Sequence, residues 1–165
     1  MVPKISHGDT NLNDLLPSCQ LPALLGGIVS WQGPCNCRRV PLPNLIRLPR
    51  GLPGFESIRE LRITPHGVLP LFHLEGLASF WAVPVERLDQ AYEAEISDDD
   101  AAVLGPDRSC WRWLAILSLQ DGELTANLLA PLVIDVAWGT AVQAVRSDQR
   151  YSHAHVVRPG KGAQC

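Results

Sequence analysis

An apolar run from Leu124 to Asp135 constrains the fold more than any other stretch of this 165-residue chain. Two residues interrupt the run. Asn127 places an amide among apolar side chains, and that amide must be hydrogen-bonded if it is buried. Pro131 removes one backbone donor from any sheet ladder. We therefore expect a bulge or a sheet edge at the proline.

The neighbours of this run predict a three-stranded meander. Trp111 to Leu119 is a second apolar run, and Asp121-Gly122 between the two is a strong hairpin signal. Downstream, Trp138-Gly139 turns the chain into Ala141 to Val145. The sequence predicts three antiparallel strands whose most buried part is Leu128 to Ile134.

Shorter segments upstream also indicate strands. Asn44 to Leu48 is a short candidate, and Ile58 to Thr64 alternates apolar and polar residues as a half-buried strand does. Pro65-His66-Gly67 is expected to turn the chain into Val68 to Leu74, which is followed by Leu77 to Val83. This succession, punctuated by Gly and Pro, predicts an all-β fold.

A corner rich in Gly and Pro lies between the first two candidate strands. Gly51 and Gly54 permit positive φ, and Pro53 pre-sets φ for a turn. We expect Phe55 to anchor this loop to the core. Backbone geometry favours a structural corner over a recognition loop, and the segment lacks the lysine of a phosphate-binding loop.

Residues 86–100 are strongly acidic, with Arg87 as their only base. Tyr92 to Ile96 alternates apolar and acidic residues, which predicts a strand with an acidic outer face. Ser97 and Asp100 have the spacing of a capping box, so at most one short helix is expected near Ser97 to Leu104. Capping and the helix dipole explain these acids better than metal binding does.

Composition favours a single domain with flexible ends. Residues 1–40 are rich in Pro, Gly, Asn and Ser and predict a poorly structured leader, 41–157 a β domain, and 158–165 a flexible tail. The five cysteines are an odd number, so we expect reduced thiols and a cytoplasmic location. No stretch is long and apolar enough to predict a membrane span.

Sequence motifs for catalysis or cofactor binding are missing. There is no nucleophile elbow, zinc-protease motif or phosphate loop. Cys35, Cys37, His153 and His155 could in principle form a metal site, since the two histidines are predicted on one face of an extended strand. A metal-dependent β-barrel enzyme is therefore a remote alternative to a binding protein without cofactors. The net charge of −3 argues against a general nucleic-acid binder.

Two blocks of the sequence resemble the signatures of one protein family, the flagellar assembly factor FliW. The first is Leu48 to Glu56. The second is Thr125 to Ile134, followed by Gly139, Gln143 and Tyr151. The likeness extends from about residue 45 to about residue 157. It implies a small, barrel-like antiparallel β fold.

The resemblance also implies a function. Members of the family bind the RNA-binding translational regulator CsrA and antagonise it, and they bind flagellin, which couples the flagellin level to flagellin translation. They use no cofactor and are not enzymes. A flagellin-dedicated chaperone without regulatory action is an alternative. The residues that we expect to contact a partner are mainly acidic: Glu75, Glu93, Glu95, Asp98, Asp99, Asp100, Glu123 and Asn127. The residues expected to shape the two motifs are Gly51, Pro53, Gly54, Phe55, Pro131 and Gly139.

Overall fold

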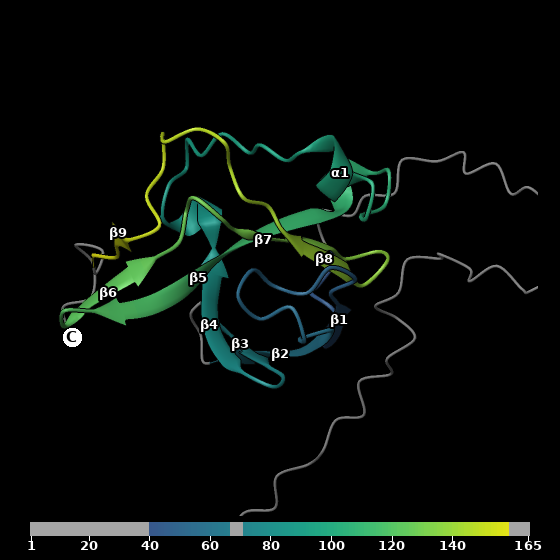
Figure 1. Ribbon diagram of the computed structural model, residues 1–165, viewed down its shortest axis with the longest axis horizontal. Coiled ribbons are helices and arrows are strands. Elements are labelled where there is room, and N and C mark those ends of the chain that lie inside the picture. The colour runs from purple at the N-terminus through teal and green to yellow at the C-terminus, as the bar shows by residue number, and fades with distance from the viewer. Residues whose placement is uncertain (1–39, 67–70, 159–165) are drawn as a thin grey trace, which may run out of the picture. The chain divides into compact units, whose positions relative to one another are not determined.

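The computed structural model describes residues 40–66 and 71–158, and it consists mainly of strands (Figure 1). The predicted leader, apart from Val40, and most of the predicted tail lie outside this range. The strands are β1 (Leu45–Arg47), β2 (Glu60–His66), β3 (Leu71–Glu75), β4 (Ser79–Pro84), β5 (Trp111–Gln120), β6 (Glu123–Ala126), β7 (Leu132–Asp135), β8 (Thr140–Gln143) and β9 (His155–Val156). The helical turns are η3 (Val85–Arg87), α1 (Asp98–Ala101) and η4 (Arg108–Cys110).

Seven of the strands close into a barrel, as the predicted all-β, barrel-like fold requires. The order around the barrel is β1-β2-β3-β4-β5-β7-β8, and β8 returns to β1. Every pairing is antiparallel except the last, where β1 meets β8 in parallel through the single pair Arg47 and Thr140. This pairing is the seam of the barrel.

β5 belongs to the barrel and to an extension at the same time. Its first part, Trp111 to Leu114, pairs with β7, and its last part, Leu117 to Gln120, pairs with β6. β6 then pairs with β9, which ends the sheet. In Figure 1 the β5–β6 hairpin and β9 project from one end of the barrel.

The apolar run after Asp121-Gly122 forms two strands, β6 and β7, where one was predicted. The hairpin turn itself is confirmed, since Asp121 and Gly122 both have positive φ (51° and 81°) and join β5 to β6. Between β6 and β7 the chain leaves the ladder. The Asn127 side-chain oxygen accepts a hydrogen bond from the Ala130 N–H at 2.9 Å, just before Pro131. The expected interruption at the proline therefore separates two strands.

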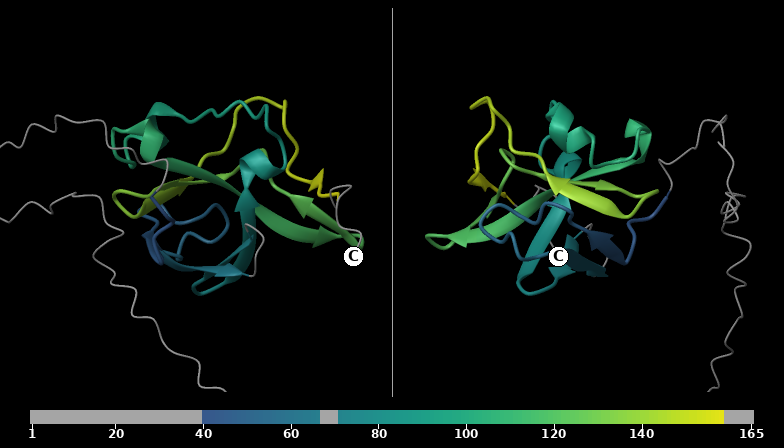
Figure 2. Two further views of the ribbon diagram at one scale, coloured as in Figure 1. Left: turned by 180° about the vertical axis from the view of Figure 1, so that it is seen from behind. Right: turned by 45° about the vertical axis from the view of Figure 1, so that its right-hand side comes forward.

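The barrel interior is filled by aliphatic side chains that alternate along the strands. Its fully buried members include Ile46, Leu48, Leu52, Ile58, Leu61, Leu74, Leu114, Leu132 and Ile134. The outer side of β5, β7 and β8 is covered as well. The chain between β4 and β5 and the chain around Tyr151 pack there as a second layer (Figure 2).

Three predictions about strands and turns are wrong. Tyr92 to Ile96 forms no strand, because Tyr92 and Ile96 pack on the outer side of the sheet and the segment pairs with no other strand. Pro65 and His66 continue β2, opposite β3, where a turn was expected. The two histidines predicted on one face of an extended strand do not share one, because His153 lies in a turn and His155 begins β9.

Two expectations about single side chains also fail. Phe55 is 47% exposed and meets Phe80 edge to face, 5.5 Å between ring centroids. The corner is anchored by Leu52 and Ile58, each 2% exposed. Cys110 is buried and disulfide-bonded, so the expectation of reduced thiols does not hold for this residue.

Candidate partner-binding surfaces

The first motif, Leu48 to Glu56, forms a tight corner that binds the acidic helix α1. Gly51 has φ of +73°, and a Cβ there would lie 2.6 Å from the Glu56 carbonyl oxygen, so only glycine fits. The corner presents Arg50 outward. Its guanidinium donates to the Asp100 carboxylate and to the Asp99 carbonyl oxygen, both at 2.8 Å. The motif thus holds the helix that carries three of the predicted partner-binding acids.

The helix begins as the sequence predicts. Ser97 is the N-cap, and its hydroxyl accepts from the Asp100 N–H at 3.1 Å and contacts the Asp100 carboxylate at 2.8 Å. Asp98 and Asp99 are exposed, and neither carboxylate has an ion-pair partner among the described residues. These two carboxylates are therefore available to a partner's charges.

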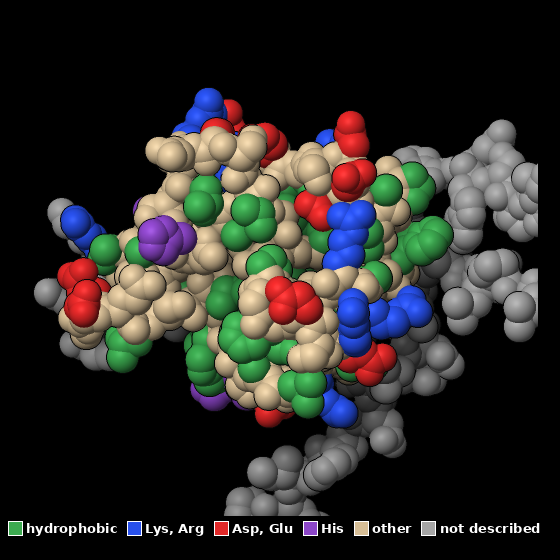
Figure 3. All heavy atoms as spheres, viewed as in Figure 1, with side chains coloured by type: hydrophobic (Ala, Val, Ile, Leu, Met, Phe, Trp, Pro, Cys, Tyr) green, Lys and Arg blue, Asp and Glu red, His purple; other side chains and the backbone are tan. Residues whose placement is uncertain are grey.

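The acids before the helix are engaged within the protein. Glu93 pairs with Arg150, and Glu95 with Arg146 at 2.9 Å. Both arginines come from the chain after β8, 51 to 57 residues away in sequence. Figure 3 accordingly shows acidic side chains interspersed with basic ones and no continuous acidic face.

Arg146 is the centre of this region. Its side chain is 2% exposed. It donates to the Glu93 carbonyl oxygen, to Glu95 and, through two nitrogens, to Asp148 at 2.9 and 2.8 Å. Its guanidinium also lies 4.9 Å from the Tyr151 ring centre and 5.6 Å from that of Tyr92. We call Arg146, these three acids and the two tyrosines the Arg146 cluster.

The charges of the Arg146 cluster shift its titrations in the directions expected of hydrogen-bonded ions. The hydrogen bond to Asp148 raises the pKa of Arg146 above its ordinary value, and the same bond lowers the pKa of Asp148. Burial raises the pKa of Tyr92, whose hydroxyl donates to the Leu128 carbonyl oxygen at 3.0 Å. These groups keep their charge states near neutral pH and serve to tie the acidic segment to the barrel.

The second motif supplies the loops between β6, β7 and β8. The Pro131 carbonyl oxygen accepts from the Ala144 N–H at 2.9 Å. Asp135 is 1% exposed and accepts from three backbone N–H groups, those of Gly105, Ala137 and Trp138, at 2.8 to 3.0 Å. Gly139 follows with φ of +64°, and its carbonyl oxygen accepts from the Arg47 N–H. Sequence reasoning missed Asp135, although a carboxylate at the end of an apolar strand is a usable signal.

The remaining predicted contact residues lie elsewhere on the surface. Glu75 ends β3, with its carboxylate 3.8 Å from His73 Nδ1. Glu123 begins β6 at the tip of the hairpin, at the opposite end of the molecule from α1 in Figures 1 and 2. The eight predicted residues are therefore not one site. Asp98, Asp99 and Asp100 are the group that remains together on one helix.

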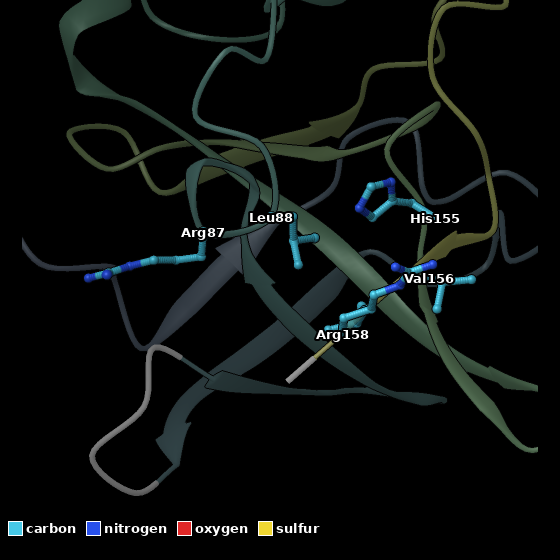
Figure 4. A pocket seen from close by; sticks show the side chains of 6 residues that line it. Arg87, Leu88, His155, Val156 and Arg158 are labelled. Atoms are coloured by element: carbon cyan, nitrogen blue, oxygen red, sulfur yellow. The ribbon is translucent and has the colours of Figure 1, made fainter. Parts of the chain in front are cut away.

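A pocket that the sequence did not indicate lies between η3 and β9 (Figure 4). Its volume is about 380 Å³, and it is lined by Arg87, Leu88, His155, Val156, Val157 and Arg158. In Figure 4 Leu88 faces His155 and Arg158 across the pocket, and Arg87 extends outward from its rim. Arg87 as the only base in an acidic segment was the one available sequence signal.

The described residues contain no group of three or more His, Cys, Asp or Glu side chains placed to hold a metal ion. The cysteines of the remote metal-site hypothesis, Cys35 and Cys37, lie outside the described range. None of the helices within that range has the length and apolar character needed to cross a membrane.

These features define a class: a small closed β-barrel, extended by a hairpin, whose loops carry charged side chains. The model of the FliW protein family matches residues 37–157. This chain therefore belongs to the FliW family.

Individual relatives agree with the family assignment. The flagellar assembly factor FliW of Thermosipho africanus is 31% identical over 120 residues, which cover 67% of this chain and 83% of that protein. The FliW of Heliobacterium modesticaldum is 28% identical over 135 residues, which cover 75% of this chain and 86% of that protein. A crystal structure of the flagellar assembly factor FliW superposes with a TM-score of 0.64 at 23% identity, over 72% of this chain and 88% of the other. The last comparison establishes the shared fold.

Proposed function

We propose that this protein binds a CsrA-type RNA-binding regulator in the cytoplasm and weakens its hold on RNA, and that it also binds flagellin. Through these two partners it couples the flagellin level to flagellin translation. It acts by binding, with no cofactor and no catalytic step. The family assignment supports this proposal, and the single structural observation that carries it is the contact between the first motif and α1.

That contact fixes an acidic surface next to a family motif. Arg50 neutralises Asp100 but leaves the carboxylates of Asp98 and Asp99 exposed at the first turn of α1. A protein that binds RNA must present basic surface, because phosphate neutralisation drives its affinity. Exposed complementary charges mainly speed association and are weakened by salt. The helix is therefore suited to guide the encounter with such a regulator.

A charge-reversal experiment tests this role. The double variant Asp98→Lys/Asp99→Lys reverses two charges without removing an internal ion pair. We expect it to slow association with the regulator about tenfold at low salt and to flatten the salt dependence, with a smaller effect on dissociation. The control is Glu86→Lys in η3, an exposed acid outside the predicted contact residues, which should associate at close to the wild-type rate. Stopped-flow or surface-based kinetics would measure both.

Titration calorimetry with the regulator from the same organism tests the partner itself. Absence of heat and of a complex at about 10–100 µM, with both proteins folded, would contradict the proposal. Flagellin binding without any effect on the regulator's affinity for RNA would instead identify a dedicated flagellin chaperone. Glu93→Lys/Glu95→Lys, which we also expect to slow association, must be assessed together with stability because both acids pair with arginines.

A further inference from the structure

The pocket between η3 and β9 carries charges that the rest of the protein leaves unmatched. Arg50, Arg146 and Arg150 all pair with carboxylates. By contrast, neither Arg87 nor Arg158 has a hydrogen bond or ion pair with any residue that the structure describes. In a chain with a net charge of −3, two arginines that have no partner among the described residues and lie beside one pocket form a local basic site.

The backbone next to the pocket is also available for hydrogen bonding. β9 ends the sheet, so one of its two edges has no neighbouring strand in the described structure. The Val157 N–H donates to the Leu124 carbonyl oxygen of β6 at 2.9 Å. Since backbone groups alternate in direction along an antiparallel strand, the N–H and C=O of Val156 point away from β6. Four consecutive residues, His155 to Arg158, line the pocket, which places it along this edge.

The walls of the pocket combine apolar and basic groups. Leu88 lies across from β9 and belongs to the outer cluster with Val85 and Leu117. His155 and Arg158 lie on the opposite wall, and Arg87 is at the rim (Figure 4). An extended peptide in this position would receive backbone hydrogen bonds from the edge, an apolar contact from Leu88 and charge neutralisation from the arginines.

We propose that the pocket between η3 and β9 binds an extended, acidic peptide segment of a partner protein by adding a strand to the free edge of β9. The Val156 N–H and C=O pair with the peptide backbone. Carboxylates of the peptide bind Arg87 and Arg158, and an aliphatic side chain between them packs on Leu88. The site is separate from α1 and does not depend on the proposed regulator.

Fluorescence anisotropy tests the proposal: labelled hexapeptides are titrated with the full-length protein. The probes are a peptide of alternating Glu and Leu and a neutral peptide of alternating Gln and Leu. We expect the acidic peptide to bind at least about tenfold more tightly, with an affinity that falls as salt rises. Equal binding of both peptides, or no binding of the acidic one, would overturn the proposal.

Three variants locate the binding. Arg87→Glu/Arg158→Glu should weaken binding of the acidic peptide by about tenfold or more, whereas Arg62→Glu, an exposed arginine of β2, should leave it unchanged. Val156→Pro removes the outward N–H while leaving the Val157 bond to β6, and it should abolish binding. Circular dichroism of each variant establishes that it is folded.

The variants also separate this site from the regulator site. A loss of peptide binding in the Arg87/Arg158 variant with unchanged regulator affinity is the expected result. Wild-type peptide binding by that folded variant, or an equal loss in the Arg62 variant, would show that the arginines of the pocket are not the ligands.

Discussion

The Arg146 cluster and the pocket at β9 differ in whether their charged side chains have partners within the protein. In the cluster a buried arginine meets acids from a distant segment, and every charge is matched inside the molecule. At the pocket, Arg87 and Arg158 remain exposed beside a free strand edge. Several acidic residues that stand out in the sequence, Glu93, Glu95 and Asp100, are therefore engaged within the protein, while two arginines without described partners lie at a pocket that the sequence did not indicate. A local excess of one charge in a sequence does not identify a binding surface until its partners are known.

Removing Arg146 should have the largest effect. Arg146→Met removes the hydrogen bonds that the guanidinium donates to the Glu93 carbonyl oxygen, Glu95 and Asp148. We expect a loss of about 3 kcal/mol in the free energy of unfolding, at the low end for a broken buried pair because the two carboxylates keep contact with water. Urea denaturation measures this loss. Arg150→Met, which removes an exposed ion pair, should cost less than about 1 kcal/mol and is the control. Equal costs for both variants would contradict the central role of Arg146.

Asn127 shapes the chain between β6, which pairs with β9 at the pocket, and β7 of the barrel. Asn127→Ala deprives the Ala130 N–H of its acceptor and should lower the free energy of unfolding by about 1–3 kcal/mol. Thermal denaturation provides the measurement. Asn127→Asp retains an acceptor oxygen and should recover most of the stability. If Asn127→Ala leaves stability unchanged and abolishes regulator binding, Asn127 is an interface residue instead.

Acid should weaken the Arg146 cluster. The folded-state pKa of Asp148 lies below its usual value of 3.8 because Arg146 donates to the carboxylate. Its contribution to stability is therefore fully present above the unfolded-state pKa and is lost as the pH falls through the lower, folded-state value. The unfolding free energy of Asp148→Asn should depend less steeply on pH below 3.8 than that of the wild type. Identical pH profiles of the two proteins would contradict this coupling.

The smallest effect on stability is expected at the pocket. Arg87→Ala and Arg158→Ala remove exposed side chains without described partners, so each should change the free energy of unfolding by less than about 0.5 kcal/mol. Urea denaturation, as for the Arg146 variants, provides the comparison. A cost near that of Arg146→Met would mean that these arginines are structural and that the contrast between the two regions does not exist.

Local features of the fold were predictable from the sequence, and long-range features were not. The Asp121-Gly122 hairpin and the Ser97 cap depend on neighbouring residues, so their patterns are direct signals. The alternation from Tyr92 to Ile96 was misleading because a chain that packs its apolar residues on the outside of a sheet shows the same period as a strand.

The ion pairs of the Arg146 cluster could not be predicted either, because they join residues far apart in the sequence. Glu95 and Arg146 are 51 residues apart, and only the closed topology brings them together. The pocket has no sequence pattern of its own, since η3 and β9 are short and meet only through the extension of the sheet. The family motifs indicated the fold because they contain residues that its turns require, such as Gly51 and Gly139, which both have positive φ.

The seam of the barrel has a consequence for folding kinetics. β1 and β8 join through one pair, Arg47 and Thr140, and the buried Thr140 hydroxyl has no hydrogen-bond partner among the described residues. Closing the seam requires a long loop to be ordered for few contacts, which is entropically costly and belongs late in folding. The same joint should be where the native barrel opens first, so amide protons of β1 should exchange with solvent faster than those of the central part of β5.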